Sequence, residues 1–192
     1  MRKILLLDNY DSFTYNLYHY VEAFNNIQVD VIRNDKVDIE TIDQYDGIIL
    51  SPGPGLPHES GLLIPVIKRY KKTKRILGVC LGQQAIAEVF DGELENLDTV
   101  YHGVSTPIKI LEPRHYIFSG LPNKVEVGRY HSWVVSHTKF PNCLKVEALD
   151  NFGRIMALRH NELDICDVQF HPESILTPVG KAIIFNWLRS SV

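Results

Sequence analysis

The chain has 192 residues, of which 45% are hydrophobic and 22% charged, and its formal net charge is −3. These proportions are those of an ordinary globular protein, and domains usually run to about 100–200 residues, so we expect a single domain over residues 1–192. A slightly acidic chain lacks the excess positive charge that attracts nucleic acid, so we expect no nucleic-acid partner.

Neither a membrane segment nor a disulfide framework is indicated by the sequence. The basic start and the apolar run Ile4–Leu7 resemble the beginning of a signal peptide, but the run stops at Asp8, far short of the ~18 apolar residues of a membrane span. The three cysteines, an odd number at wide spacing, are Cys80, Cys143 and Cys166, which favours a reducing compartment. We therefore expect a cytoplasmic protein without a membrane partner.

In the first half of the chain, short apolar runs alternate with longer segments of helical period. The expected strands are Lys3–Leu7, Gln28–Arg33, Gly47–Leu50 and Arg75–Val79, and the expected helices are Ser12–Phe24, Gly61–Tyr70 and Gln83–Phe90. This alternation predicts βαβ units with right-handed crossovers, and hence a mostly parallel central sheet with helices on both faces.

From about Glu93 the pattern changes to short β-rich runs that are separated by turn residues and not by helices. The runs are Val104–Ile110, Lys124–Val127, Leu144–Leu149, Arg154–Arg159 and Ile165–Gln169. They predict a smaller antiparallel part of an α/β fold. Pro178 followed by Val179–Leu188 then predicts a terminal helix with proline in its first turn.

The segment Gly78–Gly82 has the pattern of a nucleophile elbow, with Cys80 in the place of the usual serine. Its flanking glycines allow a sharp turn between strand and helix, which would expose the Cys80 sulfur at the top of the sheet. The helix N-terminus would favour the thiolate, and the N–H of Leu81 would be a natural oxyanion donor. The alternative is a small buried apolar cysteine, but two flanking glycines favour the nucleophile.

A cysteine nucleophile needs a base, and the base needs a group that orients it. His171 and Glu173 can supply both, because residues two apart in an extended chain point to the same side. Pro172 between them stiffens the spacing and disfavours helix at His171. A surface turn with two unrelated polar residues is the alternative, and the position after an expected strand favours the functional interpretation.

A third segment, Ser51–Pro57, follows another expected strand and contains two glycines and three prolines. Such a loop is rigid and exposes backbone N–H groups that suit an anion or an oxyanion, although a simple surface turn explains the composition equally well. It is not a phosphate-binding P-loop, because no Gly-Lys-Ser/Thr follows.

Together the segments Ser51–Gly55, Gly78–Gln84 and Gln169–Ser174 resemble the class I (triad) glutamine amidotransferases. Three further segments narrow the resemblance to component II of anthranilate synthase and to the amidotransferase subunit of aminodeoxychorismate synthase. They are Leu7–Leu17, His102–Gly103 and Arg129–Trp133. The resemblance extends over essentially the whole chain, and it implies the α/β class I glutamine amidotransferase fold.

The resemblance also implies roles for individual residues. Cys80 would attack the carboxamide of L-glutamine, His171 would activate Cys80 and protonate the leaving ammonia, and Glu173 would orient His171. Residues similar to those that bind glutamine and its oxyanion are Gly53, Pro54, Gly55, Leu81, Gln84, Ser132 and Trp133. Most relatives have leucine at the last of these positions, so Trp133 departs from the family pattern.

Two segments resemble the partner-facing side of the family. They contain Asp11 and Ser12 in the first segment, and His102 and Gly103 in the second; Asp11 and Ser12 would also cap the first helix. The implied partner is a large chorismate-binding synthase subunit, component I, which would receive the ammonia. We expect no cofactor and no metal in this chain, with magnesium only in the partner, because no Cys/His spacing indicates a metal site.

Alternative functions stay open from the sequence. The chain could serve aminodeoxychorismate formation for folate, or both that pathway and tryptophan biosynthesis, because the motifs are common to both. A different amidotransferase, for GMP or carbamoyl-phosphate synthesis, is disfavoured by Asp8–Leu17. A catalytically inactive regulatory subunit is disfavoured because Cys80, His171 and Glu173 are all present.

Overall fold

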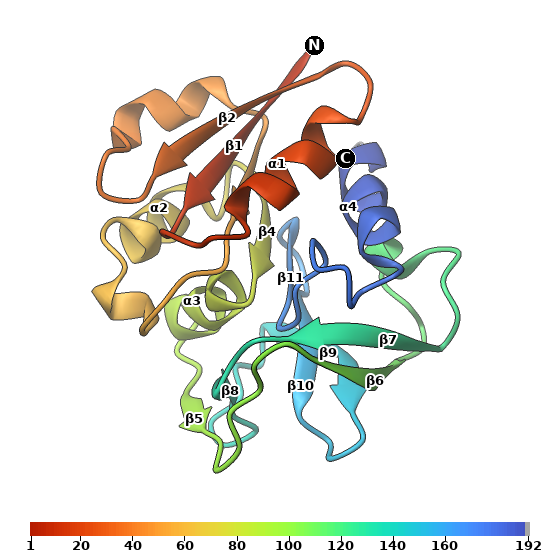
Figure 1. Cartoon of the computed structure of the whole chain (residues 1–192). Helices are drawn as coiled ribbons and strands as arrows, with labels where there is room; N and C mark the ends of the chain where they lie inside the picture. Colours follow the sequence, from red (N-terminus) through yellow and green to blue (C-terminus); the bar gives the residue numbers. More distant parts are fainter. Residues whose placement is uncertain (191–192) are drawn as a thin grey trace.

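A computed structural model describes residues 1–190, in which one twisted sheet has the strand order β2-β1-β3-β4-β11-β10-β9-β6-β7 (Figure 1). Its parallel half consists of β2 (Ile27–Arg33), β1 (Arg2–Asp8), β3 (Gly47–Leu50), β4 (Arg75–Val79) and β11 (Ile165–Val168). Its antiparallel half consists of β10 (Ile155–His160), β9 (Leu144–Asp150), β6 (Val104–Ile110) and β7 (Lys124–Arg129). The antiparallel strands therefore continue the parallel sheet.

A separate two-stranded antiparallel sheet pairs β5 (Leu94–Asn96) with β8 (Trp133–Val135). The α-helices are α1 (Thr14–Glu22), α2 (Leu63–Tyr70), α3 (Leu81–Val89) and α4 (Gly180–Arg189). Short 3₁₀ helices are η1 (Ile39–Gln44), η2 (Pro57–Glu59) and η3 (Tyr116–Phe118). No helix within residues 1–190 is long and apolar enough to cross a membrane.

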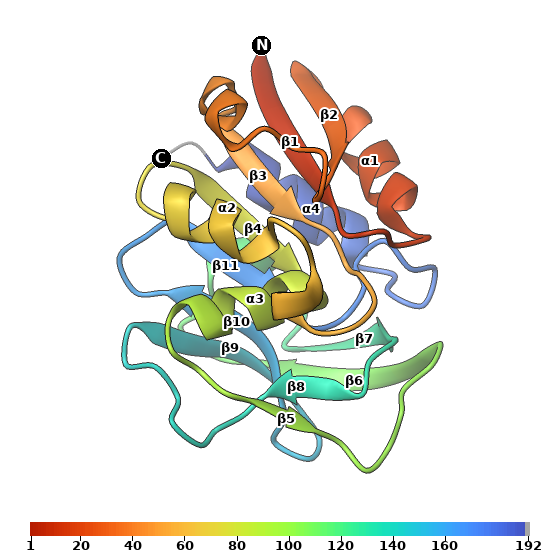
Figure 2. The same cartoon turned by 90° about the vertical axis from the view of Figure 1, so that its left-hand side faces the viewer.

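Helices cover both faces of the parallel half, with α1 and α4 on one face and α2 and α3 on the other, which lies toward the viewer in Figure 2. Alternate side chains of β1 pack against the two helical layers. Ile4 and Leu6 belong to the apolar cluster with α1 and α4, and Leu5 and Leu7 belong to the cluster with α2 and α3. A strand that is buried on both faces has a continuous apolar run, as parallel strands do. The predicted fold class is confirmed.

The entrance to α1 differs from the prediction that Asp11 and Ser12 cap a helix beginning at Ser12. The helix begins at Thr14, and its N-cap residue Phe13 makes no side-chain capping hydrogen bond. The carboxylate of Asp11 instead accepts a hydrogen bond from the backbone N–H of Phe13 at 3.0 Å, while the Thr14 hydroxyl donates to Asp8 at 2.8 Å. Carboxylates thus hold the turn before the helix, and the prediction of a Ser12 cap was wrong.

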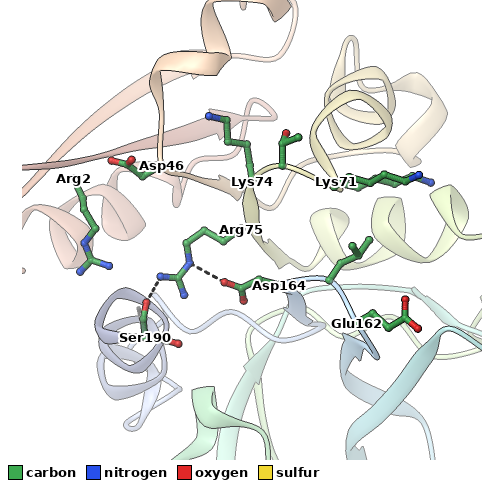
Figure 3. A pocket seen from close by; sticks show the side chains of 11 residues that line it. Arg2, Asp46, Lys71, Lys74, Arg75, Glu162, Asp164 and Ser190 are labelled. Carbon is green, nitrogen blue, oxygen red and sulfur yellow. Dashed lines mark hydrogen bonds and ion pairs between the residues drawn. The ribbon is translucent and has the colours of Figure 1, made fainter. Parts of the chain in front are cut away.

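A hollow of about 450 Å³ lies at the amino-terminal ends of the parallel strands (Figure 3). Arg75 at the start of β4 donates to the carbonyls of Ser190 and, at 2.8 Å, of Trp187, and its guanidinium stacks on the Trp187 ring at 4.6 Å. Its Nε lies 3.3 Å from Oδ2 of Asp164. Arg75 therefore fastens the end of α4 to the sheet.

Candidate active site

Cys80 occupies a strained turn between β4 and α3. Its backbone has φ 52° and ψ −99°, a conformation that costs a residue with a side chain on the order of 1–3 kcal/mol. Its N–H donates to the carbonyl of Val168 at 2.8 Å, which ties the turn to β11. The strain is therefore carried by the cysteine itself, and the surrounding hydrogen bonds hold it there.

Glycine is required beside Cys80 because the elbow packs against backbone. A Cβ atom on Gly82 would lie 2.7 Å from the carbonyl oxygen of Leu50 in β3, and one on Gly53 would lie 2.6 Å from the carbonyl oxygen of Asn9. These distances are far below van der Waals contact, so a larger residue at Gly82 would push the elbow away from β3, and one at Gly53 would push the loop Ser51–Gly55 away from Asn9 and from Leu81 of the elbow. The two glycine-rich segments of the sequence meet here.

His171 and Glu173 form a buried pair, with Nδ1 of His171 2.6 Å from Oε1 of Glu173. Within the described residues, Nε2 of His171 has no hydrogen-bond partner that satisfies geometric criteria. Cys80 is nevertheless close enough to His171 to shift its pKa. The carboxylate therefore fixes one imidazole nitrogen and leaves the other for the nucleophile, which is the division of roles in a catalytic triad.

The pairing of His171 with Glu173 is made in a turn, and the expectation of an extended chain at these residues was wrong. β11 ends at Val168, and the N–H of Ser174 donates to the carbonyl of His171 at 3.2 Å. The Thr177 hydroxyl donates to the same carbonyl at 2.7 Å. Local hydrogen bonds, which a period-two argument does not include, thus bring the two side chains together.

Burial alone lowers the pKa of His171, but the Cys80 thiolate and the Glu173 carboxylate raise it by more, so that its pKa lies well above the ordinary value. The negative groups on both sides of the ring stabilise the imidazolium. The raised pKa therefore holds His171 as an imidazolium beside Cys80, the arrangement of a reactive cysteine–histidine site.

A pocket of about 210 Å³ opens directly above Cys80. All of the residues expected to bind glutamine line it, namely Gly53, Pro54, Gly55, Leu81, Gln84, Ser132 and Trp133. Three segments distant in the sequence meet here: one follows β3, one follows β4, and one lies at the start of β8. The pocket is also lined by residues with no predicted binding role, namely Val100, Tyr101, Tyr130 and His131.

A buried network supports the Ser132–Trp133 wall of this pocket. Burial, followed by the charge of Arg129, lowers the pKa of His131 to about 3, so its ring is neutral near pH 7. Since Nε of Arg129 lies 3.1 Å from Nε2 of His131 and can only donate, Nδ1 of His131 must carry the proton that goes to the Trp133 carbonyl at 3.0 Å. Arg129 is held in turn by Asp150 at 2.8 Å.

The residues expected to face a partner border the same site. Ser12, His102 and Gly103 are exposed, and His102 also lines the pocket. Asp11 is half-buried, and its carboxylate lies within 4.8 Å of the ligand atoms of His171 and Glu173. Among residues 1–190, this is the group of side chains whose spacing would allow a metal ion to bind. Because Glu173 already accepts a hydrogen bond from Nδ1 of His171, the arrangement suits an oriented base better than a metal site.

Two aromatic residues with no predicted role pack on His171. The ring of Tyr130 lies 4.8 Å and that of Phe13 6.0 Å from the imidazole, and the two rings are 5.3 Å apart. Phe13 stands at the entrance to α1 and Tyr130 just after β7. No periodicity or spacing relates these positions, so only the folded chain shows that they enclose the base.

The sequence matches the family model described as glutamine amidotransferase class-I over residues 5–190. The chain belongs to this family. Anthranilate synthase component 2 of Pseudomonas aeruginosa is 42% identical to this class-I amidotransferase over 97% of this chain and 94% of its own. Aminodeoxychorismate/anthranilate synthase component 2 of Bacillus subtilis is 42% identical over 97% of this chain and 96% of its own.

The fold of this class-I amidotransferase is found in solved structures as well. The crystal structure of a candidate GMP synthase protein from Thermoplasma acidophilum superposes with a TM-score of 0.86 at 25% sequence identity. The match covers 98% of this chain and 92% of the other. The predicted resemblance and fold are therefore confirmed.

Proposed function

We propose that this chain is component II of anthranilate synthase, which hydrolyses L-glutamine and supplies ammonia to a large chorismate-binding subunit for tryptophan biosynthesis. The observation that carries the proposal is the oriented His171–Glu173 pair beside Cys80 at the base of a pocket of about 210 Å³. A pocket of this size suits a single small amino acid.

In the first half-reaction, the Cys80 thiolate attacks the carboxamide carbon of glutamine, and the carbonyl oxygen becomes an oxyanion. Backbone N–H groups of Gly53 and Leu81 are the proposed donors to that oxyanion, since both residues line the pocket beside the sulfur. The protonated His171 gives its proton to the leaving nitrogen, the C–N bond breaks, and ammonia departs from a glutamyl thioester.

In the second half-reaction, neutral His171 takes a proton from water as the water oxygen attacks the thioester carbon. The C–S bond breaks, L-glutamate leaves, and the thiolate–imidazolium pair is restored. Glu173 holds Nδ1 throughout, so Nε2 faces the reacting atoms in both steps. The proposed steps use only groups of this chain and water, so we propose no cofactor here and magnesium only in the partner.

The proposed partner is component I, and the proposed contact surface is formed by Asp11, Ser12, His102 and Gly103 beside the pocket mouth. Ammonia made at Cys80 would then enter the partner without crossing bulk solvent. The reaction of the complex, amination of chorismate with loss of its side chain, would make it a lyase. We propose a cytoplasmic location.

The second candidate is the amidotransferase subunit of aminodeoxychorismate synthase, or a subunit shared by both enzymes. It is favoured by the Bacillus subtilis relative, whose name includes both functions. This relative and the Pseudomonas aeruginosa protein are each 42% identical to the chain. An inactive regulatory subunit is less well supported, because the triad groups are in place.

The deciding experiment is co-purification of the chain with each candidate large subunit, followed by product identification from chorismate and glutamine. Anthranilate with one partner alone supports the first proposal, and aminodeoxychorismate alone supports the second. Production of both would identify a shared subunit. Absence of any glutamine hydrolysis in these complexes would contradict all three and favour the regulatory role.

A further inference from the structure

Gln169 lies directly after β11, and its side-chain amide stands between Cys80 and Gln84. Its Nε2 is 3.5 Å from the sulfur of Cys80, and its Oε1 is 3.3 Å from Nε2 of Gln84. The residue is completely buried. It therefore touches both the nucleophile and a residue of the proposed glutamine pocket, and no step of the proposed reaction uses it.

The orientation of the Gln169 amide follows from its neighbours. Nε2 of Gln84 also lies 3.0 Å from the carbonyl oxygen of Trp133, which can only accept a hydrogen bond. The nitrogen of Gln84 must therefore face Trp133, and it presents its second N–H toward Gln169. Gln169 must therefore accept this hydrogen bond with its side-chain oxygen, which leaves its own N–H directed at the sulfur of Cys80.

A neighbouring buried pair fastens α3 to β11 through a hydrogen bond that does not involve the sulfur. Nε2 of Gln83 donates to Asp167 at 2.7 Å, and the same carboxyl oxygen accepts from the N–H of Leu158 at 3.0 Å. Asp167 in β11 and Gln169 directly after it are two residues apart, and both are hydrogen-bonded to side chains of α3. The role of holding the helix can therefore be separated experimentally from the contact with Cys80.

We propose that Gln169 is a positioning residue for the nucleophile, donating its amide N–H to the Cys80 sulfur and stabilising the thiolate together with His171. The inference rests on the proposed function of Cys80. A hydrogen bond to a charged acceptor is stronger than one to a neutral acceptor, so the contact favours the thiolate over the thiol. Through Gln84 the same amide links the occupancy of the glutamine pocket to the sulfur.

The test is the pH dependence of alkylation of Cys80 by iodoacetamide, read by mass spectrometry on the intact chain. Gln169→Leu removes the donor, and we expect the midpoint of the alkylation profile to move to higher pH by about one unit, which is a tenfold loss of thiolate below the midpoint. Gln169→Glu keeps the side-chain volume but brings a carboxylate to the sulfur, so its shift should be larger.

The matched control is Gln83→Leu, the same substitution at an equally buried position, whose side-chain amide donates to Asp167 and not to Cys80. Burial raises the pKa of Asp167 well above its usual range, which favours the neutral form of the carboxyl left behind, so the variant is expected to fold. Asp167→Asn is the second control, because it retains the neutral group and its shape. Both controls should have the wild-type midpoint.

Wild-type midpoints in both Gln169 variants would overturn the proposal. An equal shift of the midpoint in the controls would also overturn it, because the effect would then come from loosening of α3. If Gln169→Leu does not fold, Gln169→Met, which keeps the length of the side chain but has no N–H donor, decides by the same criterion. A different result would overturn the proposed function itself: wild-type Cys80 that reacts no faster than the half-exposed Cys143. The two failures are therefore distinguishable.

Discussion

Glu173 accepts a hydrogen bond from Nδ1 of His171 at 2.6 Å, and both side chains are almost completely buried. The carboxylate is one of the groups that raise the pKa of His171, and it also determines which imidazole nitrogen faces Cys80. Glu173→Gln preserves the size of the side chain but removes the charge. The amide can also turn its N–H toward Nδ1, which would favour the wrong tautomer.

We expect Glu173→Gln to lower kcat for glutamine hydrolysis by roughly 100- to 10,000-fold, since orientation and general acid–base catalysis contribute in that range. The alkaline limb of the pH–rate profile should move to lower pH, because the imidazolium loses a stabilising charge. Steady-state kinetics from pH 5 to 10 would show both effects. An unchanged profile with a small loss of kcat would mean that Glu173 is not the orienting group.

Cys80→Ala should abolish glutamine-dependent synthesis by the complex while ammonia-dependent synthesis remains. The reason is that the proposed thioester forms only on Cys80, whereas free ammonia would reach the partner's site directly. Product formation from chorismate with glutamine and with ammonium salts is the measurement. An equal fall of both activities would show that Cys80 has a structural role at the strained elbow.

A glutamine-mimicking diazo-ketone should label Cys80 before Cys143 or Cys166. Cys80 has the imidazolium of His171 beside it, whereas burial raises the pKa of the Cys166 thiol well above its usual range and Cys166 is completely covered. Cys143 is half-buried and lies far along the chain from the triad motifs. Peptide mapping after limited exposure would compare the three, and equal labelling would count against the site.

Much of this site could be predicted from the sequence, because Cys80, His171 and the loop Ser51–Gly55 all follow strands whose ends meet at one edge of a parallel sheet. Residues that act through contacts between distant segments could not be predicted. Phe13 and Tyr130 enclose His171 from two different parts of the chain. Gln169 belongs to a sequence motif, but its contact with Cys80 could not be predicted from that motif. The capping role of Ser12 failed for a related reason, since carboxylates before the helix hold that turn.

Acid should destabilise the protein in part through His131. Its folded pKa of about 3 is below the ordinary value of 6.5, so the unfolded chain binds a proton that the folded chain does not. The contribution of His131 is therefore fully present above about pH 6.5 and is lost as pH falls toward 3. The loss for one such group approaches about 1.4 kcal/mol per pH unit between these limits.

His131→Gln should have a less steep fall in the free energy of unfolding between pH 6.5 and 4 than the wild type, measured by urea denaturation. His58→Gln changes an exposed histidine and serves as the control, which should follow the wild-type slope. Equal slopes in all three proteins would mean that His131 is not held neutral by the fold.

Glutamine hydrolysis by the chain alone should be slow and should rise when the large subunit binds, most of all with chorismate present. Ammonia released without an acceptor wastes glutamine, and the proposed contact surface adjoins the site closely enough for coupling. Phe13, at the entrance to α1 next to Asp11 and Ser12, packs on His171, and His102 packs on Tyr130 with ring centroids 6.3 Å apart. A partner that binds these segments therefore acts one contact away from the base.

The partner can activate the site only by binding the competent arrangement more tightly than the others. A tenfold activation requires about 1.4 kcal/mol of such preference, which a few interfacial contacts can supply.

Phe13→Leu should reduce the activation by the partner, since it removes the ring between α1 and His171. Tyr15→Leu, on the exposed face of α1, is the matched control for a lost aromatic side chain. Steady-state kinetics of the chain alone, with partner, and with partner plus chorismate would measure the coupling. Identical kcat/KM in the three states would exclude it, and equal loss in both variants would assign the effect to weaker binding of the partner.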